Sequence, residues 1–130
     1  MNLLEVIHQR WAAATALDSL LPAARVYTGM SADPSRPFAV IFKQSHRPLA
    51  QCNDGTAFAA IGLRIQVFHD NHDAAAAIVD QLKAAFDRTQ FSLSGNDTVI
   101  LVQHSNDWEK QNEDGVWQMT VDFLCTVCIG

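Results

Sequence analysis

The sequence lacks the features that mark several large classes of protein. Nine Lys and Arg stand against fourteen Asp and Glu, a formal charge of −5, and no basic cluster interrupts this balance. Proteins that hold nucleic acid normally present a basic patch to the phosphate backbone, so we predict no sequence-specific nucleic-acid binding. No run approaches the roughly 18 apolar residues of a transmembrane helix, and Glu5, His8 and Arg10 interrupt the segment where a signal peptide needs an apolar core. We therefore expect a cytosolic protein with no membrane partner.

Motifs of catalysis and of nucleotide binding are also missing. The chain contains no G-x-S-x-G, no G-x-G-x-x-G and no P-loop. His104 and Asp107 have the residue types of an acid/base pair, but they stand where a strand enters a polar connection, which usually carries solvated side chains. We predict no catalytic residues and no cofactor.

Cysteine is scarce, and an odd number of three does not make a disulfide framework. Cys125 and Cys128 form a C-x-x-C, but they lie in a segment that alternates apolar and polar residues, which is typical of a strand. Side chains three positions apart on a strand point to opposite faces, about 10 Å apart. One metal ion cannot bind both thiolates without breaking the strand, so we predict free thiols.

Two histidines and two aspartates crowd into five consecutive residues ahead of an alanine-rich run. His69, His72 and Asp73 have the residue types of a metal site, and a small metal-dependent hydrolase is the enzymatic alternative. The junction between a strand and a helix accounts for the carboxylates instead, since Asp70 or Asn71 can accept a hydrogen bond from the first helical turn. We predict Asp70 as the N-cap, with Asp73 completing an approximate capping box, and no metal ligand.

Hydrophobic periodicity predicts six elements in the order α-β-β-α-β-β. An apolar stripe predicts a first helix over about 2–20, and the alanine-rich run after Asp73 predicts a second. Four apolar or alternating runs predict strands over about 38–43, 57–68, 98–104 and 116–128. We therefore expect one α+β domain over residues 1–130, with a four-stranded, mainly antiparallel sheet and both helices packed on one face.

Two exposed polar connections join the strands of the predicted hairpins, over about 44–56 and 105–114. An Asp-Gly turn signal lies in the first, at residues 54–55, and at the end of the second, at residues 114–115. Long polar connections on a small domain with no evident active site favour assembly over catalysis. A Trp in such a connection either packs back onto the domain or anchors a partner, and both interpretations stay open. The candidate contacts with another copy or a partner are Lys43, His46 and Arg47 on or beside the first connection, and Trp108, Glu109 and Lys110 on the second.

Five segments of the chain, taken in order, form a pattern. They are the amphipathic first helix, a short "RVYTG", the strand entry "PSRPFAVI", the strand "IGLRIQVFHDN" running into "AAAAIVDQLKAAF", and the closing "VWQMTVDFLCTV". Together they resemble the small tail completion, or tail terminator, proteins of long-tailed bacteriophages and prophages. The resemblance covers nearly the whole chain.

This resemblance implies a non-enzymatic structural protein that closes into a ring, commonly of six subunits, at the end of the tail tube facing the head. Such a ring would stop tube polymerisation and give the head a surface on which to dock. The expected partners are further copies of the chain, the tail tube protein and a head–tail connector protein. The expected location is the cytoplasm of the bacterial host during assembly and then the virion tail. Another head–tail connector or assembly component is the alternative within this class.

Overall fold

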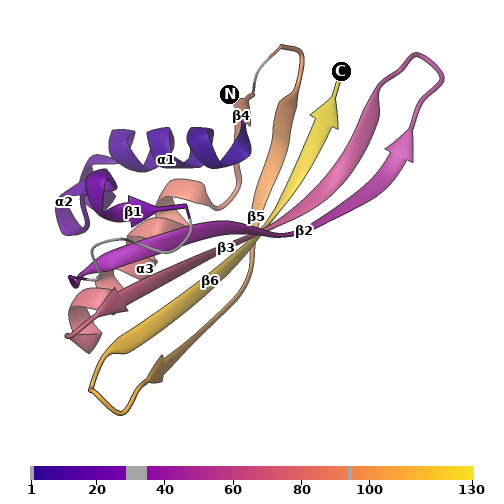
Figure 1. The fold of residues 1–130 in the computed structure, drawn as a ribbon. Helices are drawn as coiled ribbons and strands as arrows, with labels where there is room; N and C mark the ends of the chain where they lie inside the picture. Colours follow the sequence, from indigo (N-terminus) through magenta and orange to yellow (C-terminus); the bar gives the residue numbers. More distant parts are fainter. Residues whose placement is uncertain (1, 29–34, 94) are drawn as a thin grey trace.

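The chain forms two layers, a single sheet on one side and the helices on the other (Figure 1). This computed structural model describes residues 2–28, 35–93 and 95–130. In those residues no helix is both long enough and apolar enough to cross a membrane. The helices are α1 (Leu3–Ala13), α2 (Thr15–Leu20), the 3-10 turn η1 (Ala23–Arg25) and α3 (His72–Phe86). The strands are β1 (Val26–Tyr27), β2 (Phe38–Gln51), β3 (Ala57–His69), β4 (Thr89–Ser92), β5 (Thr98–Gln111) and β6 (Trp117–Ile129).

The predicted four-stranded sheet with two helices is wrong, because the sheet has six strands in the order β1-β2-β3-β6-β5-β4. It is also mixed, since β1 runs parallel to β2 while every other neighbouring pair is antiparallel. The sequence missed β1 and β4, which have two and four residues and are too short to show a period. The single helix predicted over 2–20 is two helices, because the backbone turns extended at Ala14, with φ −83° and ψ 91°.

The core fills the space between the helices and one face of the sheet. Alternate residues of β3 and β6 are almost fully buried there, and α3 packs over them with its own apolar stripe. The rings of Phe86 on α3 and Phe123 on β6 meet edge to face, with centroids 6.1 Å apart. Trp11 of α1 is fully buried, and its indole N–H donates to the Leu21 carbonyl at 2.8 Å, which fixes α1 to the segment after α2.

The cysteines of the last strand lie as the alternation predicted. Cys125 is buried and Cys128 is half-buried three positions on, so the two thiols lie on opposite faces of β6. Burial raises the pKa of the Cys125 thiol to about 12. Cys52 is also a free thiol, and it is exposed.

The two long hairpins are arranged with approximate two-fold symmetry. β5 and β6 begin at residues 98 and 117, each sixty residues after the start of β2 at 38 and of β3 at 57. The glycines of the two turns, Gly55 and Gly115, share this spacing and have positive φ of 92° and 81°. β3 and β6 lie antiparallel side by side at the centre of the sheet, so hairpins β2–β3 and β5–β6 extend from opposite ends of it (Figure 1).

Candidate subunit interfaces

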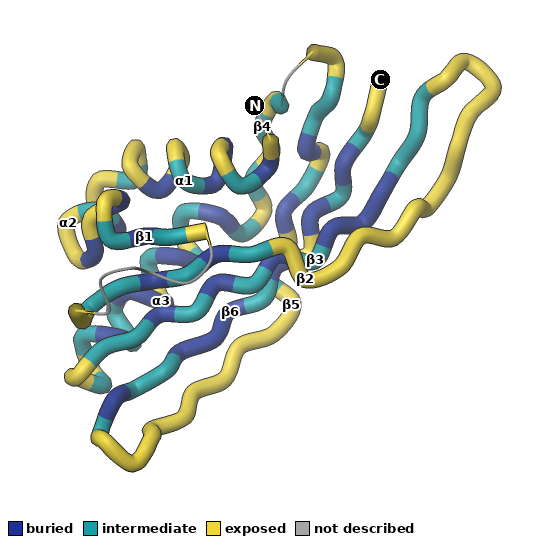
Figure 2. The backbone as a smooth tube through the Cα atoms, viewed as in Figure 1, coloured by how far each residue is buried: buried dark blue, intermediate teal, exposed yellow. Residues whose placement is uncertain are grey.

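Two long strand segments have no neighbouring strand on one side. β1 pairs only with the start of β2, and β4 pairs with β5 only as far as Val102. Among the described residues, 43–51 of β2 and 103–111 of β5 therefore have no strand partner on their outer side. We call these segments the β2 edge and the β5 edge. On the β5 edge, the Asp87 side chain accepts a hydrogen bond from the His104 N–H at 2.8 Å. Figure 2 shows them as two long exposed stretches toward opposite ends of the sheet.

These edges are the polar stretches that the sequence predicted as connections over about 44–56 and 105–114. The structure assigns most of both stretches to strand and leaves only short turns at 52–56 and 112–116. In these turns the Cys52 N–H donates to the Thr56 carbonyl at 2.8 Å, and the Asn112 N–H donates to the Val116 carbonyl at 3.0 Å. These strand residues are polar because the β2 edge projects beyond the cover of the helices, and the β5 edge runs past the flank of α3 and meets it through polar side chains.

The β2 edge is basic and unengaged. It carries Lys43, His46 and Arg47 and no acidic residue. All three side chains are exposed, and none of them makes a side-chain hydrogen bond or ion pair with the described part of the chain. A bulge between Pro48 and Ala50 leaves the intervening leucine exposed on the same edge. The three predicted contact residues of this segment thus lie together on one free strand edge.

The β5 edge carries two carboxylates that attach it to α3. Lys83 Nζ lies 2.7 Å from Asp107 Oδ2, and His104 Nε2 lies 2.8 Å from the same oxygen. His72 Nε2 lies 2.9 Å from Glu109 Oε2. The ammonium of Lys83 is the main cause of a lowered pKa at Asp107, so this carboxylate stays ionised. These contacts hold the edge in place and leave it acidic.

Trp108 lies on the other, helix-free face of the sheet. The guanidinium of Arg64 stands 4.7 Å from the centroid of its ring, and a two-point ion pair to Asp122, at 2.8 and 3.0 Å, holds that guanidinium in position. The indole nevertheless keeps 40% of its surface exposed. Trp108 therefore packs on its own sheet and still presents a large apolar surface beside the β5 edge, where Lys110 is also exposed.

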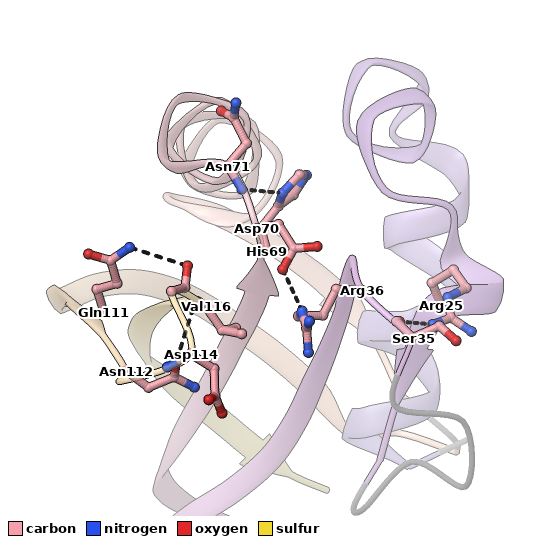
Figure 3. Close-up of polar contacts among 11 residues, drawn as sticks. Arg25, Ser35, Arg36, His69, Asp70, Asn71, Gln111, Asn112, Asp114 and Val116 are labelled. Carbon is pink, nitrogen blue, oxygen red and sulfur yellow. Dashed lines mark hydrogen bonds and ion pairs between the residues drawn. The ribbon is translucent and has the colours of Figure 1, made fainter.

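The N-cap of α3 is Asn71, and the prediction of Asp70 is wrong. The Asn71 side-chain oxygen accepts a hydrogen bond from the Ala74 N–H at 2.9 Å. Asp70 instead accepts from Arg36 Nε at 2.6 Å, an ion pair that joins the start of α3 to the segment entering β2 (Figure 3). The predicted cap position is off by one residue, because both residue types can cap a helix and the end of the strand decides between them. The predicted capping box with Asp73 is wrong for the same reason, since the third helical position after Asn71 is Ala74.

The two histidines of this junction have separate partners. His69 Nδ1 accepts a hydrogen bond from the Asn71 N–H at 3.0 Å (Figure 3). His72 lies between Asp73 and Glu109, with its ring edge-on to Trp117 at 4.6 Å between centroids. The two carboxylates, Asp73 first, raise the pKa of His72. Within residues 2–28, 35–93 and 95–130 no group of three or more His, Cys, Asp or Glu side chains is placed to hold a metal ion.

Comparison with known proteins identifies the family. The model of the family described as "Tail completion protein gp17" matches residues 5–127. The chain belongs to this tail completion family. It is a structural protein of a phage-type tail, and the resemblance seen in the sequence is confirmed.

A solved structure shares the fold of this family member. A chain of the "Virion of native gene transfer agent (GTA) particle" superposes with a TM-score of 0.74 at 14% identity, over 95% of this chain and 92% of that one. Identity this low shows the common fold alone. No curated protein sequence matches the chain.

Proposed function

We propose that the chain assembles head to tail into a ring that closes the tail tube and joins it to the head. The observation that carries this proposal is the position of the two free strand edges, on opposite sides and toward opposite ends of one sheet. A contact between two different edges is heterologous, and heterologous contacts close into a ring when the rotation between subunits divides a full turn. Membership of a tail completion family supports other tail components as partners.

The two hairpins would give such a ring two different rims. The turn at 52–56 and the turn at 112–116 lie at opposite ends of the sheet (Figure 1). If the strands run from one rim to the other, one set of turns faces the tail tube protein and the other faces the head–tail connector. An adaptor between two partners needs this kind of two-sided subunit.

The family resemblance supports six subunits as the number in the ring. Assembly takes place in the cytoplasm of the bacterial host, before the ring enters the virion tail. The ring acts by position and shape, and no step of this function requires catalysis.

Light scattering coupled to size exclusion tests ring formation, with and without purified tail tube protein. We expect one closed species with a narrow mass distribution, near six subunits, over a range of concentrations. A protein that stays monomeric at high concentration both alone and with the tube would contradict the ring.

Tube polymerisation tests the position of the ring in the tail. Increasing amounts of the protein should shorten the tubes formed in vitro, because capped ends stop growing. A connector component that acts elsewhere would leave tube length unchanged, which would favour the alternative assembly role.

A further inference from the structure

We propose that the β2 edge of one subunit pairs antiparallel with the β5 edge of the next. The four long strands of each subunit would then form one continuous wall around the ring. This inference rests on the proposed ring and specifies the surfaces that close it. The occupant of each free edge is a second copy of this chain.

The two edges match in position. Among the described residues, β1 pairs with β2 only as far as Val40 and β4 pairs with β5 only as far as Val102, and the β2 edge and the β5 edge follow these points and run to the strand ends at Gln51 and Gln111. β1 covers the first part of β2 and β4 covers the first part of β5, so the free parts lie toward opposite ends of the sheet. A staggered neighbour can therefore add a strand to each free part without displacing β1 or β4.

The charges of the edges favour unlike pairing. The β2 edge has two lysine or arginine cations and no acid, whereas the β5 edge has two carboxylates and one lysine. Pairing two β2 edges would set Lys43 and Arg47 near the same cations of the partner, and like charges across strands destabilise. Pairing a β2 edge with a β5 edge brings Lys43 and His46, which lie on the helix-bearing face, toward Asp107 and Glu109 on the same face. This complementarity also steers the encounter.

The faces of the sheet restrict the register. Residues directly opposite in antiparallel strands share a face. Arg47 is opposite Ala60, which lies four positions from Arg64 on β3 and hence on the helix-free face. On the β5 edge, Trp108 contacts Arg64 on that face, and Asn106 and Lys110 share it because they are two positions away. A continuous helix-free face therefore places Arg47 opposite one of these three residues.

The shift between neighbouring subunits along the strand direction selects two of these three registers. Through the paired strands, Asn106 is level with Arg64 of β3, and Trp108 is level with Gln66. Arg47 is level with Ala60 of its own subunit. Pairing it with Asn106 therefore shifts the next subunit along the strands by four residues, and pairing it with Trp108 shifts it by six. At about 3.3 Å per residue these shifts are about 13 Å and about 20 Å.

Four strands spaced about 4.8 Å apart span about 19 Å, so these shifts correspond to strand tilts of about 35° and about 46°. Closed barrels tilt their strands by about 35–45°, and the eight-residue shift that Lys110 requires would exceed this range at about 54°. The register thus places Arg47 of one subunit opposite Asn106 or Trp108 of the next, which is a geometry that a closed wall adopts.

Disulfide trapping tests this register. On a Cys52→Ser, Cys128→Ser background, Arg47→Cys is combined in one chain with Asn106→Cys or with Trp108→Cys. Directly opposite strand residues have Cα atoms about 4.5–5.5 Å apart, within the range of a disulfide. Under mild oxidation we expect one of the two pairs to give a ladder of covalent oligomers that ends at the mass of the ring.

The matched control replaces Arg47→Cys by His46→Cys in the same pairs. His46 is the adjacent residue on the same edge, is exposed, and points to the opposite face. We expect its ladder to be at least about tenfold weaker, because thiols on opposite faces of paired strands cannot reach each other. Equal yields of covalent oligomers from His46→Cys and Arg47→Cys would overturn the register. Covalent dimers formed by Arg47→Cys without a second introduced cysteine would overturn it as well.

Light scattering on the same samples separates this inference from the proposed function. Rings of the expected mass that give no ladder from either pair would overturn the edge pairing and leave the ring in place. An unsubstituted chain that stays monomeric, with or without the tail tube, would count against both.

Discussion

At the start of α3, adjacent side chains have different structural roles. Asn71 caps the helix, Asp70 forms an ion pair with Arg36, and His69 accepts a hydrogen bond from the Asn71 N–H. The sequence predicted a strand-to-helix junction here, and it was right in kind. It could not assign the cap, because the choice between Asp70 and Asn71 depends on which residue leaves the strand with its side chain turned toward the helix.

We predict that Asn71→Ala lowers the free energy of unfolding by about 0.5–2 kcal/mol, the usual effect of removing an N-cap. Asp70→Ala is the neighbouring control and should cost between about 0 and 1 kcal/mol, because its ion pair with Arg36 is exposed. Urea denaturation of both variants measures the difference. A larger loss for Asp70→Ala than for Asn71→Ala would contradict the cap seen in the structure.

His72 should make stability depend on pH. Asp73 and then Glu109 raise its pKa in the folded state above the usual value of about 6.5. The stabilisation from the protonated ring is complete below about pH 6.5 and is lost as the pH rises through the higher folded-state pKa. Stability curves of the wild type and His72→Gln should therefore converge as the pH increases from about 6 to about 9.

Glu109→Gln supplies the control for this pH dependence, since it removes one of the two carboxylates and keeps the imidazole. It should reduce the convergence without abolishing it, because Asp73 remains. If the difference in unfolding free energy between the wild type and His72→Gln does not change with pH, the imidazole of His72 is not stabilised as a cation in the folded protein.

At the scale of elements, the sequence predicted best where one face of a strand or helix is buried along its length. β3 was predicted to end at 68 and α3 to follow directly, and the structure places them at Ala57–His69 and His72–Phe86. The other strands of the two hairpins were predicted to end at 43 and 104, whereas β2 continues to Gln51 and β5 to Gln111. The outer strands stop pairing at Val40 and Val102, two or three residues before those predicted ends.

The free edges therefore could not be seen as strands from hydrophobic periodicity. The β2 edge faces solvent and the β5 edge meets α3 through polar side chains, so the residues of both edges have no reason to alternate between apolar and polar. One further signal was present, since the Asp-Gly turns at Gly55 and Gly115 are sixty residues apart and each is followed by a long alternating strand. Comparing the two hairpins at that spacing would have indicated equal strand lengths before and after each turn.

Trp108 allows a test of the β5 edge as an element of assembly. Trp108→Ala should lower self-association strongly and the melting temperature only slightly, because the indole is 40% exposed and its contact with Arg64 contributes only about 0.5–1 kcal/mol. Leu124→Ala is the matched control, since Leu124 is 39% exposed but lies on the interior strand β6. Sedimentation velocity and thermal denaturation measure the two effects. Unchanged association with a large fall in melting temperature would assign the indole to the core.

At the scale of the whole molecule, the approximate two-fold arrangement relates one hairpin to the other but leaves their turns chemically different. The turn at 52–56 carries one acidic residue and an exposed thiol, whereas the turn at 112–116 carries two acidic residues. A subunit built in this way offers similar frameworks with different surfaces at its two ends. This is the geometry that an adaptor between unlike partners requires, and it follows from the hairpins extending from opposite ends of the sheet.

Bulky labels on the two turns test the adaptor directly. A polyethylene glycol maleimide is attached to the natural Cys52 in a Cys128→Ser chain, or to Glu113→Cys in a Cys52→Ser, Cys128→Ser chain. Cys125 stays unlabelled in both, because it is buried and its pKa of about 12 keeps the thiol protonated. Both labelled proteins should still form rings, since neither turn belongs to a strand edge. Each label should reduce binding at least about tenfold to a different partner, one to the tail tube protein and the other to the head–tail connector. Two labels that block the same partner would show that both turns face one rim, and the strands could not then run from rim to rim.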